Sequence, residues 1–325
     1  MKKIAVNGMG RIGRCVTRAL LDSGQLAVVN SNKLNPQNAA HMLQYDSIHG
    51  RLSDSISCAK HGIIYNGNEI KISDKNSLYE MRWNNIDIVL ECSGAFNSKE
   101  QAYKHIENGA KTVIVSAPCT AADYTVILGV NDIPNDIARK VISVGSCTTN
   151  CLANVVKPLH NAFHITSAFM TTIHAYTNDQ SLLDSRHTDL RRGRAAESSM
   201  IPTSTGAAKI IGEIIPELQG RIDGVAVRVP VQNVSMIDLT FTAEKSATEH
   251  EINEVMKEAA ARIPNILNYC EEPLVSIDFN HTIYSAAFDA TQTKIIDKKL
   301  FRVVAWYDNE WGFTNRMIDL ITHFN

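Results

Sequence analysis

Apolar and polar positions at the start of the chain predict a buried strand, a helix and a second strand. Residues 3–7 form an apolar run that stops at Gly8, which is typical of a buried strand. From Arg11 onward, apolar residues recur at helical spacing until Gly24 ends the pattern. A second apolar run, 26–30, follows directly. We therefore expect a strand–helix–strand unit here.

The same alternation continues as far as residue 144. Further strand-like runs are 63–65, 86–90, 112–115, 126–130 and 140–144, and helical stretches include 38–44 and 98–108. Alternating strands and helices indicate a doubly wound, mostly parallel sheet. Ligands of such sheets bind beyond the carboxyl ends of the strands. The strand tips of interest are Asn32, Ser93–Gly94, Ser116–Cys119 and Ser143–Cys147.

Three glycines lie between the first predicted strand and its helix, in the pattern Gly8-x-Gly10-x-x-Gly13. The first permits a tight turn, the second lets a pyrophosphate approach the backbone, and the third lets the helix pack on the strand. The helix N-terminus offers N–H groups to the phosphates. Because a lone motif of this kind can be a chance glycine-rich turn, the order of strand, glycines, helix and strand carries the prediction. We expect a Rossmann dinucleotide site that includes Arg11 and Ile12.

The position that selects between NAD and NADP carries no acid. An NAD-preferring site usually has Asp or Glu after the second strand, where it binds the ribose 2′-OH and repels a 2′-phosphate. Residues 29–35 read VNSNKLN. Asn32 could still hydrogen-bond the ribose of NAD, or it could admit NADP with Lys33 nearby. The residues alone leave both interpretations open.

Composition and charge restrict the class of protein. A chain of 325 residues is long enough for about two domains, and 44% apolar with 20% charged residues is ordinary for a soluble globular protein. The net charge of −2 argues against a dedicated nucleic-acid partner. The N-terminus lacks a signal-peptide core, and no run is long enough to span a membrane. Seven scattered cysteines favour a reduced, cytoplasmic location over a disulfide framework.

The stretch SVGSCTTNCLAN at 143–154 raises the question of chemistry. A zinc site is disfavoured because no second tight pair of Cys or His follows Cys147 and Cys151, so we expect no metal. Helical spacing begins around Thr148 or Thr149. A cysteine at a helix N-terminus lies in positive potential, which lowers its pKa and favours the nucleophilic thiolate. We expect Cys147 to be the nucleophile, with a structural cysteine as the alternative, and Cys151 to pack in the core.

A candidate base follows the next predicted strand. Residues 168–173 are strand-like, and His174 lies at the end of this run. A purely structural histidine is the alternative. Strand-end placement together with a candidate thiolate favours a role as base or acid.

Arginine-rich segments come next. The segment 186–199 is dense in arginine, 203–209 reads TSTGAAK before a predicted helix, and Arg228 lies inside the apolar run 225–231. Arginine forks, threonine hydroxyls and helix N-termini bind phosphate oxygens. The cluster Arg191–Arg194 could equally lie in a solvated or subunit-facing loop. Arg228 needs a partner, because a charge inside a strand is costly to leave unpaired.

The chain resembles the phosphorylating glyceraldehyde-3-phosphate dehydrogenases over essentially its whole length. The motifs that carry the resemblance are NGMGRIGR at 7–14, YDSIHGRL at 45–52, SCTTNC at 146–151, HAYTNDQ at 174–180, DLRRGRAA at 189–196, PTSTGAAK at 202–209, RVPVQNVS at 228–235 and WYDNEWGF at 306–313. The resemblance implies a dinucleotide-binding domain, 1–146 with the C-terminal helix 310–325, and an α+β catalytic domain, 147–309. It also implies a homotetramer and a place in glycolysis or gluconeogenesis.

The resemblance also implies a chemistry. Cys147 attacks the aldehyde of glyceraldehyde 3-phosphate, His174 takes the proton, and the resulting thioester is cleaved by inorganic phosphate to 1,3-bisphosphoglycerate. The implied site for the substrate phosphate is Thr177, Asp179 and Arg228. The implied site for inorganic phosphate is Ser146, Thr148, Arg192, Thr205 and Gly206. The cofactor contacts are Gly8, Gly10, Arg11, Ile12, Gly13, Asn32, Ser93, Cys119, Arg186 and Asn309, of which Asn309 matches the residue that fixes the nicotinamide amide.

Five positions, at three sites in the chain, depart from the family pattern. Val144 and Gly145 replace the usual Asn-Ala before the reactive cysteine, so the nicotinamide environment is open to change. Asn32 replaces the usual Asp, and Ser185-Arg186 replaces a Leu-Pro pair common in NAD-specific members. Arg186, from a neighbouring subunit, could meet a 2′-phosphate. The last two changes favour dual or NADP-preferring use.

Other readings remain. An erythrose-4-phosphate dehydrogenase would share most of these motifs but usually has Glu near position 32. A thiol hydrolase would have no use for the glycine turn. A non-enzymatic binding role would survive substitution of Cys147.

Overall fold

The computed structural model describes residues 1–324 and consists of two compact units. The first unit contains Met1–Val126, Asp132–Ser146 and the C-terminal segment from Thr314. The second contains Ile127–Asn131 and Cys147–Phe313. Residues 127–131 and 310–313, which the sequence analysis grouped with the first part, therefore belong to the second unit.

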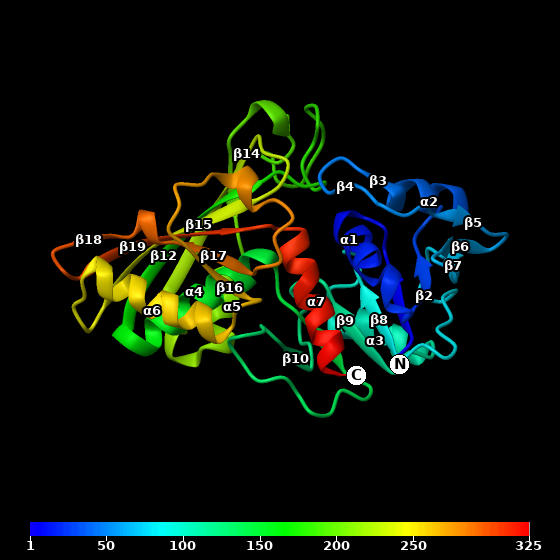
Figure 1. Ribbon diagram of the computed structural model, residues 1–325, viewed down its shortest axis with the longest axis horizontal. Coiled ribbons are helices and arrows are strands. Elements are labelled where there is room, and N and C mark those ends of the chain that lie inside the picture. The colour runs from blue at the N-terminus through cyan, green and yellow to red at the C-terminus, as the bar shows by residue number, and fades with distance from the viewer. Residues whose placement is uncertain (325) are drawn as a thin grey trace. The chain divides into compact units, whose positions relative to one another are not determined.

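The first unit is built on a nine-stranded sheet with the order β10-β11-β9-β8-β1-β2-β7-β6-β5 (Figure 1). Its strands are β1 Ile4–Asn7, β2 Leu26–Asn30, β5 Ser57–Cys58, β6 Gly62–Tyr65, β7 Asn68–Ser73, β8 Ile88–Glu91, β9 Thr112–Val115, β10 Tyr124–Thr125 and β11 Val141–Ser143. All pairs from β10 to β7 are parallel. The chain order reverses between β1 and β8, which is the switch point where doubly wound sheets bind ligands. The predicted doubly wound fold is confirmed.

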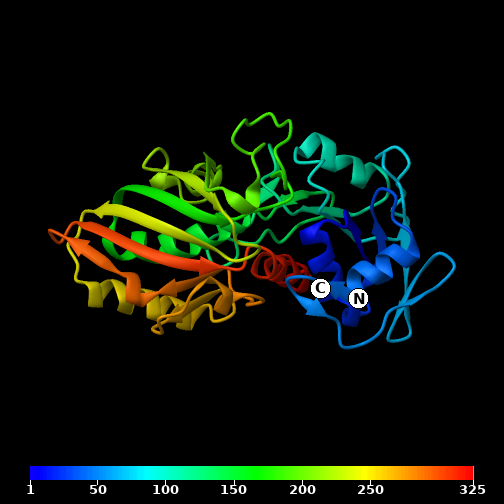
Figure 2. The ribbon, with the colours of Figure 1, turned by 90° about the horizontal axis from the view of Figure 1, so that it is seen from above.

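Helices cover both faces of this sheet. They are α1 Arg11–Leu20, continued by a 3₁₀ turn Leu21–Ser23, α2 Pro36–Gln44 and α3 Lys99–Glu107. Figure 2 shows α3 on the opposite side of the sheet from α1 and α2. Side-chain caps define the starts of two of them, because Asn35 and Ser98 accept hydrogen bonds from the first turns of α2 and α3. A short hairpin, β3 Tyr45–Asp46 with β4 Gly50–Arg51, follows α2.

The predicted strand at 126–130 is wrong. Only Tyr124–Thr125 pairs with β11, and the chain then turns. The N–H of Val130 bonds to the carbonyl of Ile127, and Gly129 adopts a positive φ of 85°. Val126, Ile127 and Leu128 are buried, and of these only Val126 still bonds to β11, through its N–H to the carbonyl of Ser143. Hydrophobicity alone therefore gave a false strand signal.

The strand predicted at 63–65 is present, but its pairing is local. β6 and β7 are antiparallel neighbours joined by a tight turn at Asn66 and Gly67, both with positive φ. β7, which was not predicted, then joins β2 in parallel. The edge of the sheet is therefore a hairpin rather than a further strand–helix unit.

The second unit has a mixed sheet with the order β13-β14-β12-β15-β19-β17-β16, and β18 pairs with β19. Its elements are α4 Cys147–Phe163, β12 Ile165–Ala175, β13 Ile201–Ser204, α5 Ala207–Ile214, β14 Ile222–Val229, β15 Ser235–Ala243, α6 Glu249–Arg262, β16 Leu267–Cys270, β17 Ala286–Asp289, β18 Lys294–Ile296 and β19 Leu300–Tyr307. The helix α7, Trp311–His323, follows β19 and runs from the second unit into the first.

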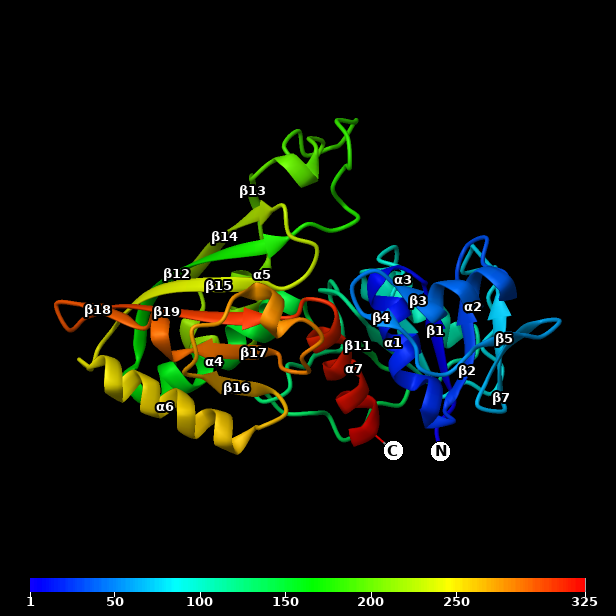
Figure 3. The ribbon, with the colours of Figure 1, turned by 45° about the horizontal axis from the view of Figure 1, so that its top comes forward.

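One face of this second sheet packs on helices and the other does not. Figure 3 shows α4, α5 and α6 on the same side of the sheet. Alternate residues of β12, such as Met170, are buried against those helices, whereas Phe169 on the other face is 50% exposed.

Two bulk properties complete the description. None of the helices in residues 1–324 is long and apolar enough to cross a bilayer. All seven cysteines are free.

Candidate functional site

Cys147 is the first residue of α4, one position earlier than the sequence spacing indicated. Its Sγ lies 3.7 Å from Nε2 of His174 on β12. The thiol is half-buried, and His174 is only 5% exposed. Two side chains that are 27 positions apart in the chain are thus brought to contact distance because β12 passes the N-terminus of α4.

Arg228 determines how His174 is oriented. β12 and β14 are parallel neighbours, and His174 is the register partner of Arg228. The arginine Nη1 lies 2.8 Å from Nδ1 of His174 and donates to the carbonyl of Ala175 at 2.9 Å. Nδ1 itself lies 2.7 Å from the same carbonyl. Because a guanidinium only donates, Nδ1 cannot both carry a proton and accept from Arg228. In the tautomer with the proton on Nδ1, that proton bonds to the Ala175 carbonyl and Arg228 donates to the carbonyl alone. The Nε2 lone pair then faces the thiol, as a base requires. The strand extends through His174, which is therefore its penultimate residue.

Burial keeps His174 neutral. The loss of solvent and then the positive charge of Arg228 lower the pKa of His174 to about 3, against a small opposing effect from the Ala175 carbonyl. A doubly protonated ring would place a full positive charge beside the guanidinium. At neutral pH the imidazole can therefore accept a proton.

The pKa of Cys147 is raised, contrary to the expectation from its place at a helix N-terminus. Burial of the sulfur raises the pKa most, while Arg228 and hydrogen bonds from Thr148 lower it by less. Desolvation outweighs these favourable contacts at this position. The pair is consequently a neutral thiol facing a neutral imidazole, and activation of the nucleophile requires proton transfer to His174.

Tyr307 and two threonines support the pair from behind. The Tyr307 hydroxyl lies 2.8 Å from the hydroxyls of both Thr148 and Thr172. Its ring meets the edge of His174 at a centroid distance of 6.0 Å. Tyr307 and Thr172 were not singled out in the sequence, although Tyr307 lies in the WYDNEWGF motif. Thr148, a candidate phosphate ligand, is 4% exposed with its hydroxyl bonded to Tyr307.

Two residues assigned to different anion sites contact each other. Arg192 pairs with Asp179 at 2.5 Å and also donates to Thr203 at 2.9 Å. Arg192 therefore carries a neutralising partner in this structure. Gly206 is the N-cap of α5, and the Thr205 hydroxyl accepts from the N–H of Ala207 at 3.3 Å.

The remaining predicted residues of the second unit have mixed exposure. Thr177 is half-buried and Arg186 is exposed. Asn309 is 6% exposed, and its Oδ1 accepts from the hydroxyl of Ser235, which in turn accepts from the N–H of Ala175 at the end of β12. The amide of Asn309 is thus tied to the strand that carries His174.

The glycine turn of the first unit is shaped for close approach. Gly8 has φ of 105°, and a Cβ there would lie 2.5 Å from the backbone nitrogen of Ser93. A Cβ on Gly13 would lie 1.9 Å from the carbonyl oxygen of Gly8. A Cβ on Gly10 would meet nothing within 4 Å, and no side chain caps α1. The start of α1 therefore has room for a phosphate, and the turn fits a dinucleotide.

The other predicted cofactor residues of the first unit lie around this edge of the sheet. Arg11 is bidentate to Asp46, at 2.6 and 3.0 Å, so its guanidinium is held by that buried carboxylate. The Arg11 partnership keeps the pKa of Asp46 well below its ordinary value, although burial acts in the opposite direction. Asn32 and Ser93 are exposed. Ile12 and Cys119 are half-buried, as is Ser146, which was predicted for the inorganic-phosphate site.

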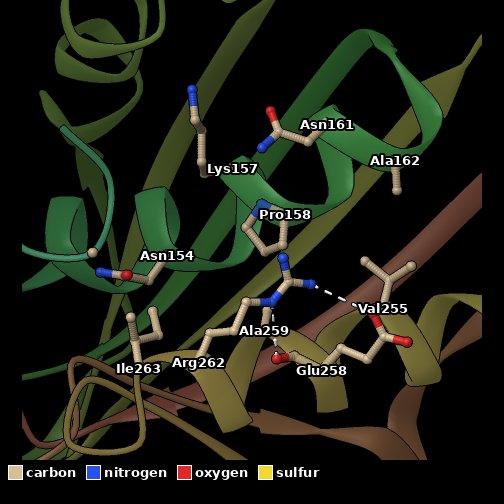
Figure 4. Close-up of a pocket in the computed structure, with 11 residues that line it drawn as sticks. Asn154, Lys157, Pro158, Asn161, Ala162, Val255, Glu258, Ala259, Arg262 and Ile263 are labelled. Atoms are coloured by element: carbon tan, nitrogen blue, oxygen red, sulfur yellow. Dashed lines mark hydrogen bonds and ion pairs between the residues drawn. The ribbon is translucent and has the colours of Figure 1, made fainter.

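A cavity of about 420 Å³ opens between α4 and α6, away from the reactive pair (Figure 4). Its lining combines apolar side chains such as Pro158 and Ile263 with the charged Lys157, Glu258 and Arg262. None of the residues predicted to bind substrate or cofactor lines it.

Comparison with known proteins agrees with these motifs. The model of the glyceraldehyde 3-phosphate dehydrogenase NAD binding domain matches residues 2–99, and that of the C-terminal domain matches residues 146–309. The chain is 47% identical over 321 residues to a glyceraldehyde-3-phosphate dehydrogenase of Cereibacter sphaeroides, covering 98% of this chain and 96% of that protein. It is 48% identical over 326 residues to the enzyme of that name from Geobacillus stearothermophilus, covering 99% and 97% respectively.

Proposed function

The chain belongs to the glyceraldehyde 3-phosphate dehydrogenase family, and we propose that it oxidises glyceraldehyde 3-phosphate with inorganic phosphate and NAD(P)+ to 1,3-bisphosphoglycerate. The observation that carries the proposal is the 3.7 Å approach of Cys147 Sγ to a buried, neutral His174. A nucleophile without a base would lack activation, and the depressed pKa leaves the His174 ring unprotonated at neutral pH, with its base site vacant.

The first step is addition of the thiol to the aldehyde. As the bond from Cys147 Sγ to the carbonyl carbon forms, the thiol proton moves to Nε2 of His174 and the carbonyl oxygen takes the negative charge. Protonation of that oxygen completes a thiohemiacetal. The Cys147 N–H at the start of α4, in the positive end of the helix dipole, stabilises the oxyanion.

The second step is oxidation to a thioester. NAD(P)+, when bound, supplies the hydride acceptor. The chain's own contribution is to hold the thiohemiacetal carbon on Cys147 while His174 takes the hydroxyl proton. Attack of inorganic phosphate on the thioester carbon then breaks the carbon–sulfur bond, yields the acyl phosphate and returns the thiolate of Cys147.

Two anion sites belong to this proposal. Arg228, Thr177 and Asp179 would hold the substrate phosphate, and Ser146, Thr148, Arg192, Thr205 and Gly206 would hold inorganic phosphate. The position of Arg228 beside His174 supports the first assignment. The Arg192–Asp179 pair implies that an incoming phosphate competes with Asp179 for the guanidinium.

The cofactor would be held by the glycine turn 8–13, with Asn32, Ser93, Cys119, Arg186 and Asn309 as further contacts. Because the exposed Asn32 brings no negative charge to the ribose position, we propose dual or NADP-preferring use. Arg186 would pair with the 2′-phosphate from a neighbouring subunit.

A homotetramer is part of the same proposal. The open face of the second sheet carries Phe169 at 50% and Val225 at 40% exposure, together with the Asp238–Arg302 ion pair. Exposed apolar side chains on a flat sheet mark an association surface. We assign the first unit to the dinucleotide and the second to catalysis, and seven free cysteines fit a reducing cytoplasmic location.

The proposal is tested by following reduced-nicotinamide absorbance with NAD and NADP in parallel, using glyceraldehyde 3-phosphate and erythrose 4-phosphate as alternative substrates. We expect turnover of glyceraldehyde 3-phosphate, a kcat/KM with NADP at least equal to that with NAD, and poor use of the erythrose. Much poorer kcat/KM with NADP would refute the cofactor preference alone. Preference for the erythrose would refute the substrate assignment.

Matched variants test the assignment of the nucleophile. Cys147→Ser should abolish turnover, whereas Cys151→Ala, one helical turn away and wholly buried in the core, should retain it. His174→Asn should lower kcat by about 10²–10⁴. A Cys147→Ser protein that still oxidised the aldehyde would contradict the mechanism.

A further inference from the structure

A chain of hydrogen-bonded side chains lies buried beneath the glycine turn of the first unit. Its members are Asn7, Asn30, Trp83, Glu91 and His105, and each is at most 2% exposed. They come from β1, β2, the segment before β8, β8 itself and α3. The reaction proposed above gives none of them a role. A buried polar network of this size is costly unless every group is satisfied.

Glu91 is the centre of the network. Its Oε1 accepts from the N–H of Ser93 at 2.7 Å and from the Ser93 hydroxyl at 2.5 Å. That hydroxyl accepts from the N–H of Ala95, so its own proton points to the carboxylate. Oε2 lies 2.6 Å from Nδ2 of Asn7 and 2.9 Å from Nε2 of His105. Because an ionised carboxylate only accepts, Glu91 can satisfy these groups as a buried anion.

The partners of His105 determine its tautomer. The indole N–H of Trp83 can only donate, and it lies 2.9 Å from Nδ1 of His105. Nδ1 must therefore accept, and the ring proton lies on Nε2, where it donates to Glu91. His105 is a neutral ring that accepts at one end and donates at the other.

The network continues to the next strand and the segment after β7. Nδ2 of Asn30 donates to Oδ1 of Asn7 at 2.7 Å and to the carbonyl of Lys75 at 2.9 Å. Oδ1 of Asn30 accepts from the N–H of Lys75 at 2.9 Å. The carboxyl ends of β2, β1 and β8 are thereby tied together on both sides of the switch point. Gly8 lies between them, bonded to the carbonyl of Asn30 at 2.7 Å and packed on the backbone of Ser93.

We propose that Glu91 and His105 are positioning residues for the dinucleotide. Glu91 fixes the backbone of Ser93 against Gly8, and His105 fixes Glu91, so that the turn is held in the shape that receives the pyrophosphate. The inference rests on the proposed dinucleotide-binding function of this unit. Since the network acts through the turn that both cofactors share, it supports NAD+ and NADP+ binding equally.

Two substitutions of His105 provide the test. A Gln side chain can accept from Trp83 and donate to Glu91, whereas Phe can do neither. We expect calorimetric titration of the full-length protein to give a dissociation constant about tenfold higher for His105→Phe, with NAD+ and with NADP+ alike. For His105→Gln we expect a value within about threefold of the wild type.

A second readout needs no cofactor. Amide hydrogen exchange at Ser93 should be faster in His105→Phe than in His105→Gln, while exchange in β15 of the second unit stays unchanged. If the Phe variant does not fold, Asn7→Ala, which keeps His105 and Trp83 in place, should show the same weaker binding and faster exchange at Ser93.

The outcomes separate the two proposals. If the wild-type protein binds neither dinucleotide, the proposed function is refuted. Wild-type binding with an unchanged dissociation constant in a folded His105→Phe or Asn7→Ala protein would overturn the positioning role. A loss confined to one of the two cofactors would also overturn it, because the network would then act on the ribose rather than on the turn.

Discussion

A single arginine acts on both reacting side chains of the second unit. The charge of Arg228 lowers the pKa of Cys147, which favours thiolate, and lowers the pKa of His174, which favours the neutral ring. Burial opposes the first effect and reinforces the second. The result is a base that is free of its proton and a thiol that keeps its own until the base takes it.

The depressed pKa of His174 has a consequence for folding. In the unfolded chain this histidine gains a proton near pH 6.5, whereas in the folded protein it stays neutral down to about 3. Its contribution to stability is therefore present above pH 6.5 and is lost as the pH falls toward 3. Between about pH 7 and pH 5 the wild type should lose about 2 kcal/mol more unfolding free energy than His174→Asn.

Urea unfolding of both proteins at the two pH values measures this difference. His160, also on the second unit but only partly buried, has its pKa lowered chiefly by burial as well. The acid sensitivity of His160→Asn is therefore compared with that of His174→Asn, as the same substitution at a less buried histidine. Equal acid sensitivity of wild type and His174→Asn would show that His174 is not held neutral.

At the scale of an element, the turn between β1 and α1 depends on where a methyl group can be accommodated. A Cβ on Gly13 would collide with the carbonyl of Gly8 at 1.9 Å, whereas a Cβ on Gly10 would lie in open space. Gly13 is therefore required by packing within the protein, whereas Gly10 is required by the space that the ligand needs.

Alanine at each position distinguishes these reasons. Gly13→Ala should lower the melting temperature by several degrees and weaken dinucleotide binding, because α1 must move away from the turn. Gly10→Ala should melt within about a degree or two of the wild type yet bind dinucleotide about tenfold more weakly, since its methyl group occupies the path of the pyrophosphate. Thermal melts give the melting temperatures, and calorimetry gives the dissociation constants for dinucleotide. A destabilised Gly10→Ala protein with unchanged affinity would contradict this division.

Elements with strong local signals were predicted well. The spans of β1, β2 and α1 agree with the apolar pattern and with Gly24 as the helix end, at a positive φ of 66°. The run 126–130 failed because burial of apolar side chains does not require a strand. Of the hairpin, β6 was predicted and β7 was not. β7 has only two buried positions among polar residues, so its own sequence is a weak strand signal until the neighbouring strands pair with it.

At the scale of the whole molecule, the open face of the second sheet is the surface most suited to association with another subunit. Its strands carry apolar side chains outward, including Phe169 and Val225, while their other face packs on α4, α5 and α6. A sheet face that none of the described helices of this unit covers, and that exposes Phe169 and Val225 beside the Asp238–Arg302 ion pair, is expected to associate with a second copy.

A charge on that face tests the expected tetramer. Phe169→Asp should shift the protein from tetramer toward smaller species, because association would bury an unpaired carboxylate. Lys257→Glu, on the opposite, helical side of the second unit and also exposed, should leave the assembly unchanged. Light scattering coupled to size-exclusion chromatography measures both. A wild-type monomer, or a Phe169→Asp tetramer, would exclude this face as the interface.

The sequence by itself determined the doubly wound fold, the glycine turn, the nucleophile candidate and the family. These depend on local periodicity and on motifs whose residues are neighbours in the chain. The proton states at Cys147, the Tyr307 support and the Glu91–His105 network were decided only by the tertiary structure. Each depends on which strand ends and helix ends meet, and on how much water they exclude, and no run of adjacent residues encodes desolvation.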